Sequence, residues 1–179
     1  MVRYLLLIAV FCFGGTALAQ APNTLLMDHM TSYEIRDAIA SGKTTVILPS
    51  GGTEQNGPGM VTGKHNFRVS ANAQTIARRL GNALVTAVIA FTPEGKYDPP
   101  TGHLRYPGTI GVPEDVYAGV VEGVVHSLKL HGFKNIVLIG DHGSDQDGQN
   151  AVAAKLNKEW AATDVRVHAI GAYYRGDPE

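Results

Sequence analysis

The 179-residue chain has a single cysteine, Cys12, and no dense run of basic residues. One cysteine excludes a disulfide framework inside the fold, although the chain remains compatible with an oxidising compartment. The 15 lysines and arginines nearly balance the 16 aspartates and glutamates, for a net charge of −1. We therefore expect neither nucleic acid nor an anionic membrane surface as a partner.

The chain also lacks an apolar run of the roughly 20 residues that a membrane-spanning helix needs. Its apolar N-terminal stretch, Leu5 to Phe13, follows the positive charge of Arg3. Ala17-Leu18-Ala19 then shows the small-x-small pattern that precedes signal cleavage. We predict a signal peptide over residues 1–19 and one domain over residues 20–179, periplasmic or secreted, with no membrane contact after cleavage. The alternative is an uncleaved N-terminal anchor.

Three common signatures of chemistry are missing. The sequence contains no HExxH pattern of the zinc proteases. The glycines at 51, 52, 57 and 59 form no GxGxxG pattern, and no lysine followed by serine or threonine comes after them. The absence of the two glycine patterns argues against a nucleotide site, and without HExxH no compact motif marks a metal site.

Two hydrophobic periodicities alternate along the rest of the chain and predict strands and helices. The predicted strands cover Thr44–Leu48, Ala83–Phe91, Asn135–Ile139 and Val165–Ala172. The predicted helices cover Thr31–Ser41, Val69–Leu80, Pro113–Gly132 and Gly148–Ala161. A capping box of Thr31 and Glu34 opens the first helix, and Val116, Val120, Val124 and Leu128 are apolar positions of the third. This order predicts an α/β fold with a mainly parallel sheet covered on both faces.

Two long irregular segments, Gly51–Arg68 and Thr92–Val112, leave from the carboxyl ends of predicted strands. Ligands of open parallel sheets bind at those ends. Loops of this length in a compact domain are often functional. We therefore look for chemistry in these two segments and after the third predicted strand.

Glu54, His65 and His142 follow two of the predicted strands and make a candidate metal site. Zinc and similar ions accept carboxylate oxygen and imidazole nitrogen, and they lower the pKa of bound water to about 7. The alternative is a surface glutamate with histidines that satisfy local backbone groups. Asp141 is a candidate catalytic or positioning residue. It could instead be a turn aspartate before Gly143.

The second long segment contains His103, Arg105 and Tyr106, which offer donors and an aromatic wall to a small polar substrate. We predict that these three side chains face the substrate, although a single loop histidine is often only solvated. Asp145 and Asp147 lie where the next helix begins, and we expect both to act in capping.

Three motifs in this order resemble the creatininase (creatinine amidohydrolase) family. They are Gly51-Gly52-Thr53-Glu54-Gln55-Asn56-Gly57-Pro58, Arg105-Tyr106-Pro107-Gly108-Thr109, and His131-Gly132-Phe133 through Gly140-Asp141-His142-Gly143. The resemblance implies a three-layer α/β/α fold and a centre of one or two divalent ions, zinc or manganese. It also implies hydrolysis of a non-peptide C–N bond in a small amide, which can be cyclic, and assembly into a homo-oligomer.

Several positions depart from the family pattern. His65 stands where the family often has a bridging aspartate, and Asn56 and Gly59 stand where relatives carry histidines. Ser144 stands where some relatives carry a glutamate ligand. The chain ends soon after the fourth predicted strand, without the family's later Glu-His segment. The resemblance therefore leaves two alternatives to an active enzyme, namely an inactive binding or structural protein and a fragment truncated at its C-terminus.

Overall fold

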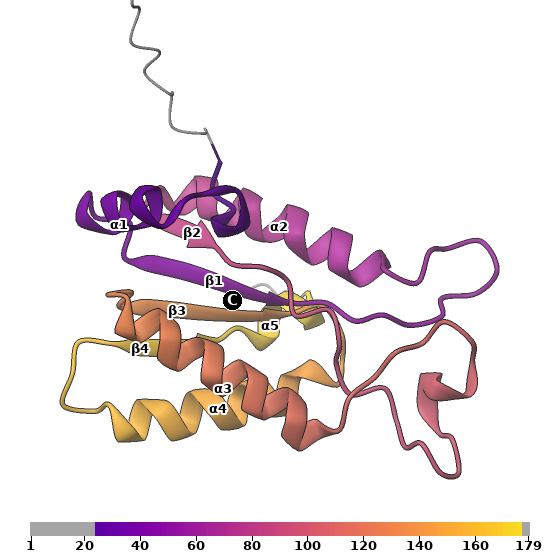
Figure 1. Cartoon of the computed structure of the whole chain (residues 1–179). Coiled ribbons are helices and arrows are strands. Elements are labelled where there is room, and N and C mark those ends of the chain that lie inside the picture. Colours follow the sequence, from indigo (N-terminus) through magenta and orange to yellow (C-terminus); the bar gives the residue numbers. More distant parts are fainter. Residues whose placement is uncertain (1–23, 177–179) are drawn as a thin grey trace, which may run out of the picture.

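The protein, seen here as a computed structural model, is described over residues 24–176, and the predicted signal peptide lies outside the described residues. Its sheet has four parallel strands in the order β2-β1-β3-β4 (Figure 1). The strands are β1 (Thr45–Ser50), β2 (Ala83–Val85), β3 (Asn135–Gly140) and β4 (Arg166–Ala169). The prediction of an α/β fold with a parallel sheet is confirmed.

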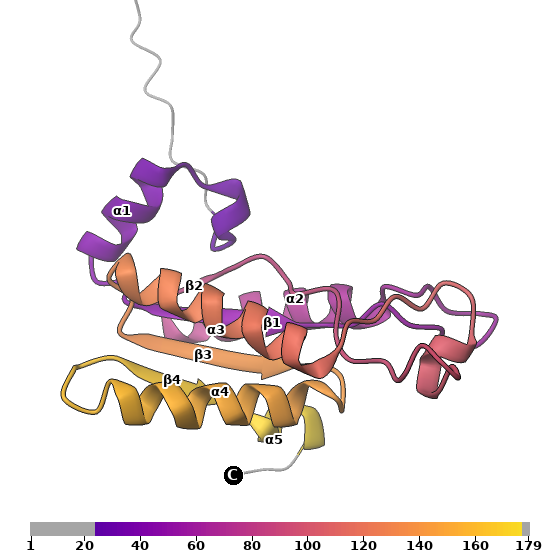
Figure 2. The same ribbon diagram turned by 60° about the horizontal axis from the view of Figure 1, so that its bottom comes forward.

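Helices cover both faces of the sheet and make a three-layer structure (Figure 2). On one face lie α2 (Lys64–Leu80) and the short α5 (Gly171–Arg175). On the other lie α3 (Glu114–Leu130) and α4 (Asp145–Glu159), and α1 (Ser32–Ala40) packs against the same core. Two 3-10 turns, Met27–His29 and Gly102–Arg105, complete the described elements. Within residues 24–176, none of the helices has the length and apolar character needed to cross a bilayer.

Strand β1 shows why the sequence folds this way. All six of its residues are buried. Val46 and Leu48 point to the core under α3 and α4, whereas Ile47 points to the core under α2. Side chains alternate between the two faces of a strand, so a strand covered on both sides is apolar along its middle, here Val46 to Pro49.

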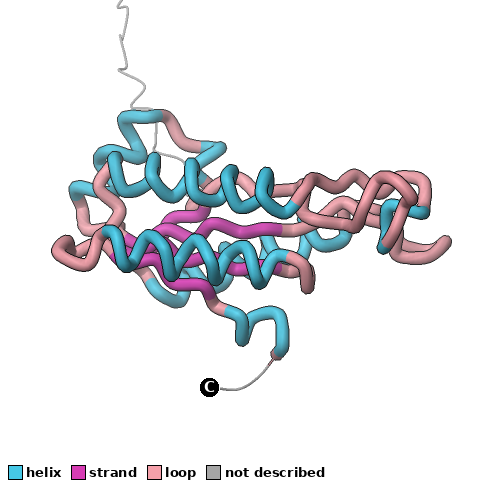
Figure 3. Tube along the Cα trace, turned by 90° about the horizontal axis from the view of Figure 1, so that it is seen from below, coloured by secondary structure: helices cyan, strands magenta, loops and turns pink. Residues whose placement is uncertain are grey.

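The direction in which the chain winds across the sheet reverses between β1 and β3. The connection from β1 to β2 runs through α2 on one face, and the connection from β2 to β3 runs through α3 on the other. Parallel sheets bind ligands where the strand order reverses, outside the carboxyl ends. The long loops extend beyond the sheet at this end (Figure 3).

Several predicted bounds were wrong by a few residues. Strand β2 ends at Val85 rather than Phe91, because the chain leaves the sheet there and pairs again only at an isolated bridge between Ser50 and Ile89. Strand β4 ends at Ala169, where α5 follows. Helix α4 begins at Asp145 instead of Gly148.

Two differences concern helix faces and starts. Helix α2 begins at Lys64 instead of Val69, which places His65 in its first turn rather than in a loop. On α3, Val116 and Val120 are about half exposed, and the neighbouring stripe that starts at Tyr117 faces the core. Helix α3 carries two adjacent apolar stripes, and packing on the sheet selects one of them. The capping box of Thr31 and Glu34 is confirmed.

Candidate metal centre

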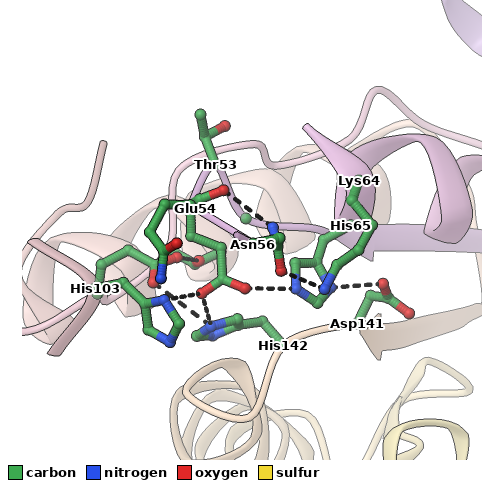
Figure 4. A network of polar contacts seen from close by, with 12 residues as sticks. Thr53, Glu54, Asn56, Lys64, His65, His103, Asp141 and His142 are labelled. Atoms are coloured by element: carbon green, nitrogen blue, oxygen red, sulfur yellow. Dashed lines mark hydrogen bonds and ion pairs between the residues drawn. The ribbon is translucent and has the colours of Figure 1, made fainter. Parts of the chain in front are cut away.

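A buried carboxylate lies between three imidazole rings at the carboxyl end of the sheet (Figure 4). Glu54 is only 3% exposed, and its two oxygens have different neighbours. Oε1 lies 2.8 Å from His65 Nε2. Oε2 lies 2.9 Å from His142 Nε2 and 3.1 Å from His103 Nδ1.

Each of these residues comes from a different element. Glu54 follows β1, and His142 follows β3. The two strands stay paired to their ends, where Ser50 lies opposite Gly140 and Asp141 N donates to Ser50 O at 3.0 Å. His65 comes from the first turn of α2, and His103 from the 3-10 turn Gly102–Arg105. The sheet and one helix therefore hold most of the cluster, and a loop supplies the last ring.

His65 joins two buried carboxylates. Its Nε2 faces Glu54, and its Nδ1 lies 2.9 Å from Asp141 Oδ2. Ionised carboxylates only accept hydrogen bonds, so an imidazolium that donates from both nitrogens satisfies both partners. The hydrogen bond to Asp141 raises the pKa of His65, and this effect together with Glu54 outweighs burial. Burial alone would raise the pKa of Glu54, but hydrogen bonds from His65 and His142 lower it overall.

Asp141 is held by three donors. Arg68 Nε lies 2.8 Å from Oδ2, and Tyr173 donates to Oδ1 at 3.0 Å, in addition to the contact with His65. Burial alone would raise the pKa of Asp141, but the hydrogen bonds from His65 and Arg68 lower it overall. An ionised carboxylate saturated in this way is suited to holding His65 in place and poorly suited to moving a proton.

His142 has the properties of a neutral metal ligand. Burial lowers its pKa and is the largest influence on it. Its Nδ1 lies 2.6 Å from Ser144 Oγ. In the absence of an ion, Nε2–H donates to Glu54 Oε2, and Ser144 N donates to Nδ1 at 3.3 Å. A shift of the ring proton to Nδ1, where Ser144 Oγ can accept it, would leave the Nε2 lone pair free for an ion. Metal-binding histidines are commonly oriented by such a hydrogen bond from the other ring nitrogen.

The ligand atoms of Glu54, His103 and His142 all lie within 4.8 Å of one another. His103 Nδ1 is buried and has no hydrogen-bond partner among the described residues, because its approach to Glu54 Oε2 lacks hydrogen-bond geometry. One ion could therefore contact Glu54 Oε2, His103 Nδ1 and His142 Nε2 in place of the hydrogen bond between Glu54 and His142. A carboxylate oxygen with two imidazole nitrogens suits zinc and several other divalent ions.

The structure brings the three predicted ligands Glu54, His65 and His142 into one bonded network. His65 is outside the group of three above, however, and metal binding by His65 stays a prediction. His103, predicted to face the substrate, lies against Glu54 instead of standing apart in its loop.

Arg105 and Tyr106 are both exposed and lie next to each other, with the Arg105 guanidinium 5.9 Å from the Tyr106 ring centre. Arg105 Nε also donates to Gly102 O at 3.1 Å. Their contact with a substrate stays a prediction.

The expected capping role of Asp145 is wrong, since this residue is the first of α4 and is fully buried, and its Oδ2 accepts from His142 N at 3.2 Å. Asp147 is exposed in the first helical turn.

One buried acid at the cluster escaped the sequence prediction. Glu94 is 3% exposed in the loop after β2. Its Oε1 accepts from Thr92 Oγ1 at 3.0 Å, and its Oε2 lies 3.5 Å from His142 Nε2. Burial, with a smaller contribution from the charge of Glu54, raises its pKa to about 7. The sequence contained one indication of this role, because Glu94 is an acidic residue in a long loop that leaves the end of a strand.

Comparison with known proteins identifies the fold. The family model described as creatinine amidohydrolase, creatininase, matches residues 28–176. The chain belongs to the creatininase family. A crystal structure of a creatininase superposes with a TM-score of 0.67 at 24% identity, over 83% of this chain and 57% of that one. The three-layer fold that the resemblance implied is therefore confirmed.

Two curated relatives match part of the chain. A 3-dehydro-scyllo-inosose hydrolase of Thermotoga maritima is 27% identical over 126 residues, which cover 70% of this chain and 38% of the relative. The creatinine amidohydrolase of Pseudomonas putida is 25% identical over 119 residues, which cover 66% of this chain and 45% of the relative. The matched segment thus spans less than half the length of either curated relative.

Proposed function

We propose that this creatininase-family chain forms the centre of a metal-dependent amidohydrolase that cleaves the C–N bond of a small amide. The observation that carries the proposal is the convergence of Glu54 Oε2, His103 Nδ1 and His142 Nε2 on one space. The curated creatinine amidohydrolase supports the reaction class. Solved creatininases include a manganese form and a Zn–Zn form, which support zinc or manganese as the ion.

One divalent ion held by these three residues would polarise the amide carbonyl and lower the pKa of a bound water. The protein fixes the carboxylate for this task. His65 bonds to Glu54 Oε1 through Nε2, and Asp141 holds the His65 ring through Nδ1. The His142 side chain is only 14% exposed and that of His103 is 43% exposed. The substrate therefore enters from the side of His103, where Arg105 and Tyr106 of the same loop would contact it.

Metal content and turnover test the proposal together. Purified protein is dialysed with zinc or manganese and compared with His142→Ala and with His29→Ala, an exposed histidine outside the cluster. We expect one ion per wild-type chain, metal-dependent release of product from creatinine or a related cyclic amide, and loss of both in His142→Ala only. Equal metal content in wild type and His142→Ala contradicts the proposal.

A second candidate is a metal-binding protein without catalytic activity. Two residues that depart from the family pattern make local contacts. Asn56 Nδ2 donates to Glu54 O at 3.0 Å, and its Oδ1 accepts from Lys64 Nζ. Ser144 contacts His142. Neither residue offers an imidazole or carboxylate to a second ion. Bound metal without turnover of any small amide would favour this candidate.

Export to the periplasm or beyond is also part of the proposal, supported by Arg3, the apolar run after it and Ala17-Leu18-Ala19. N-terminal sequencing of protein from a periplasmic extract tests it, with Gln20 expected as the first residue.

Assembly into a homo-oligomer is supported by exposed apolar side chains on the loops, including Met60, Val61 and Ile110. Light scattering of the purified protein gives its mass directly.

A further inference from the structure

Glu94 lies beside His142 in the candidate metal centre, with Oε2 3.5 Å from His142 Nε2, and the proposed function gives it no role. We propose that Glu94 is a fourth ligand of the same ion, bound through Oε2. The inference rests on the proposed function, because it requires that an ion binds between Glu54 and His142. It deepens that function by defining a site of two carboxylates and two imidazoles.

The distances around His142 fit a single ion. Its Nε2 lies 2.9 Å from Glu54 Oε2 and 3.5 Å from Glu94 Oε2. With metal–ligand bonds of about 2.1 Å, two ligand atoms lie about 3.0 Å apart at a right angle and about 3.4 Å apart in tetrahedral geometry. Both carboxylates therefore stand at separations from His142 that ligands of one ion adopt. Glu94, like His65, lies outside the group of Glu54, His103 and His142, so its place in the site rests on its distance to His142 and on its unpartnered oxygen.

The unsatisfied atoms of the protein point to the same place. Three buried side-chain polar atoms within residues 24–176 lack a hydrogen-bond partner, and two of them are Glu94 Oε2 and His103 Nδ1. The Glu94 side chain is 0% exposed. A buried carboxylate oxygen with no partner is costly, and proteins keep such a group where it meets a ligand or an ion.

Charge balance also favours a second carboxylate. Glu54 with two neutral imidazoles would leave a divalent ion with a net charge of +1 in a buried position, whereas Glu54 and Glu94 together neutralise it. An ion held between the two carboxylates would also remove the repulsion between their charges.

The surrounding backbone is shaped around Glu94. A Cβ on Gly111 would lie 2.8 Å from Glu94 Cβ, and a Cβ on Gly102 would lie 2.4 Å from Glu94 O. Thr92 fixes the other carboxylate oxygen by donating to Oε1. Glu94 O accepts from His103 N at 3.0 Å, so the loop that carries the third ligand is built on the same residue.

A simpler role for Glu94 would be that of a neutral acid that donates a hydrogen bond to a neighbour. Glutamine separates the two roles, because it keeps the shape and can donate where a protonated carboxyl would, but it offers no anionic oxygen. Aspartate keeps the charge but withdraws the carboxylate from the ion by one methylene. Glu114→Gln, at an exposed position of α3, is the matched control.

The experiment is a competition titration of metal-free protein with zinc and with manganese against a chromophoric chelator. We expect Glu94→Gln to weaken binding by more than about 100-fold, the upper end of the loss caused by removing a hydrogen bond to a ligand. Glu94→Asp should weaken binding by at least about tenfold, and Glu114→Gln should bind as the wild type does. Circular dichroism of each metal-free variant verifies its fold.

Wild-type affinity in Glu94→Gln overturns the inference and leaves the proposed function intact. If Glu94→Gln fails to fold, Glu94→Asp decides alone. A wild-type protein that binds neither ion overturns the inference and the proposed function together.

Discussion

Glu54 and His142 are 88 positions apart in the chain, yet Glu54 Oε2 lies 2.9 Å from His142 Nε2. The contact exists because β1 and β3 are parallel neighbours that end in register, with Ser50 opposite Gly140. Each residue lies in the segment that follows its strand. The reversal of strand order thus places a carboxylate and an imidazole together without any local sequence motif.

The orientation of His142 should depend on Ser144. Replacement of Ser144 by alanine removes the hydroxyl that lies 2.6 Å from Nδ1 and frees the ring to adopt the other tautomer. We expect zinc affinity to fall by about tenfold to 100-fold with little change in stability. Isothermal titration measures this, with Ser127→Ala on the exposed face of α3 as the control. Equal affinity in wild type and Ser144→Ala would show that the hydroxyl does not orient the ring.

His65 should contribute stability that depends on pH. In His65→Asn, Glu54 and Asp141 lose the cation between them, and we expect a loss of about 3 to 5 kcal/mol, as for other buried ion pairs with one partner removed. The pKa of His65 is raised in the folded protein. Its contribution is therefore complete below its unfolded pKa of about 6.5 and disappears as the pH rises through the higher folded value.

Urea denaturation of metal-free wild type and His65→Asn at about pH 6 and about pH 9 measures this dependence. The difference in unfolding free energy should shrink toward the higher pH. A difference that grows with pH contradicts the assignment of His65 as the cation between the two carboxylates.

Glu94 should destabilise the metal-free protein at neutral pH. Its pKa is raised to about 7, so the folded state binds its proton more tightly than the unfolded state does. The stability of the wild type relative to Glu94→Gln therefore falls as the pH rises from about 4.5 to about 7. At about 1.4 kcal/mol per pKa unit, we expect Glu94→Gln to be more stable by up to about 3 kcal/mol at pH 8.

Thermal or urea unfolding of the metal-free forms verifies this gain, with Glu114→Gln expected to show no such trend. The same substitution should then stabilise the empty protein and weaken ion binding. A Glu94→Gln protein that is less stable than wild type at every pH would assign Glu94 a purely structural role.

A buried polar network anchors the end of β1. Tyr117 donates to Ser50 Oγ at 2.8 Å, and Gln149 Nε2 lies 3.1 Å from the Tyr117 hydroxyl. Tyr117→Phe removes the shared hydroxyl from a fully buried position, and we expect a loss of about 1 to 3 kcal/mol of unfolding free energy. Tyr33→Phe, at a side chain that is 68% exposed, should cost almost nothing. Similar losses in the two variants would show that the network contributes no stability.

The parallel sheet and the pairing of Glu54 with His142 could be predicted because they depend on periodicity and on strand ends, which are local properties of the sequence. The start of α2 could not, because the segment before Val69 lacks an apolar repeat and becomes helical through its place beside the sheet. His65 was consequently expected in a loop.

His103 and Glu94 illustrate a different limit. Both lie in the long connection between β2 and α3, where the backbone follows no repeating pattern. Their position against Glu54 depends on turns at glycines and on hydrogen bonds such as Thr92 to Glu94. Since these features arise from the folded loop as a whole, spacing alone identified neither residue as a neighbour of His142.

Anomalous diffraction from crystals of the protein soaked in zinc or manganese tests the central claim most directly. The account predicts one strong peak per chain, within about 2.0 to 2.3 Å of Glu54 Oε2, His103 Nδ1 and His142 Nε2. No peak at this position, or a peak held by other side chains while these three keep their contacts with one another, would contradict it.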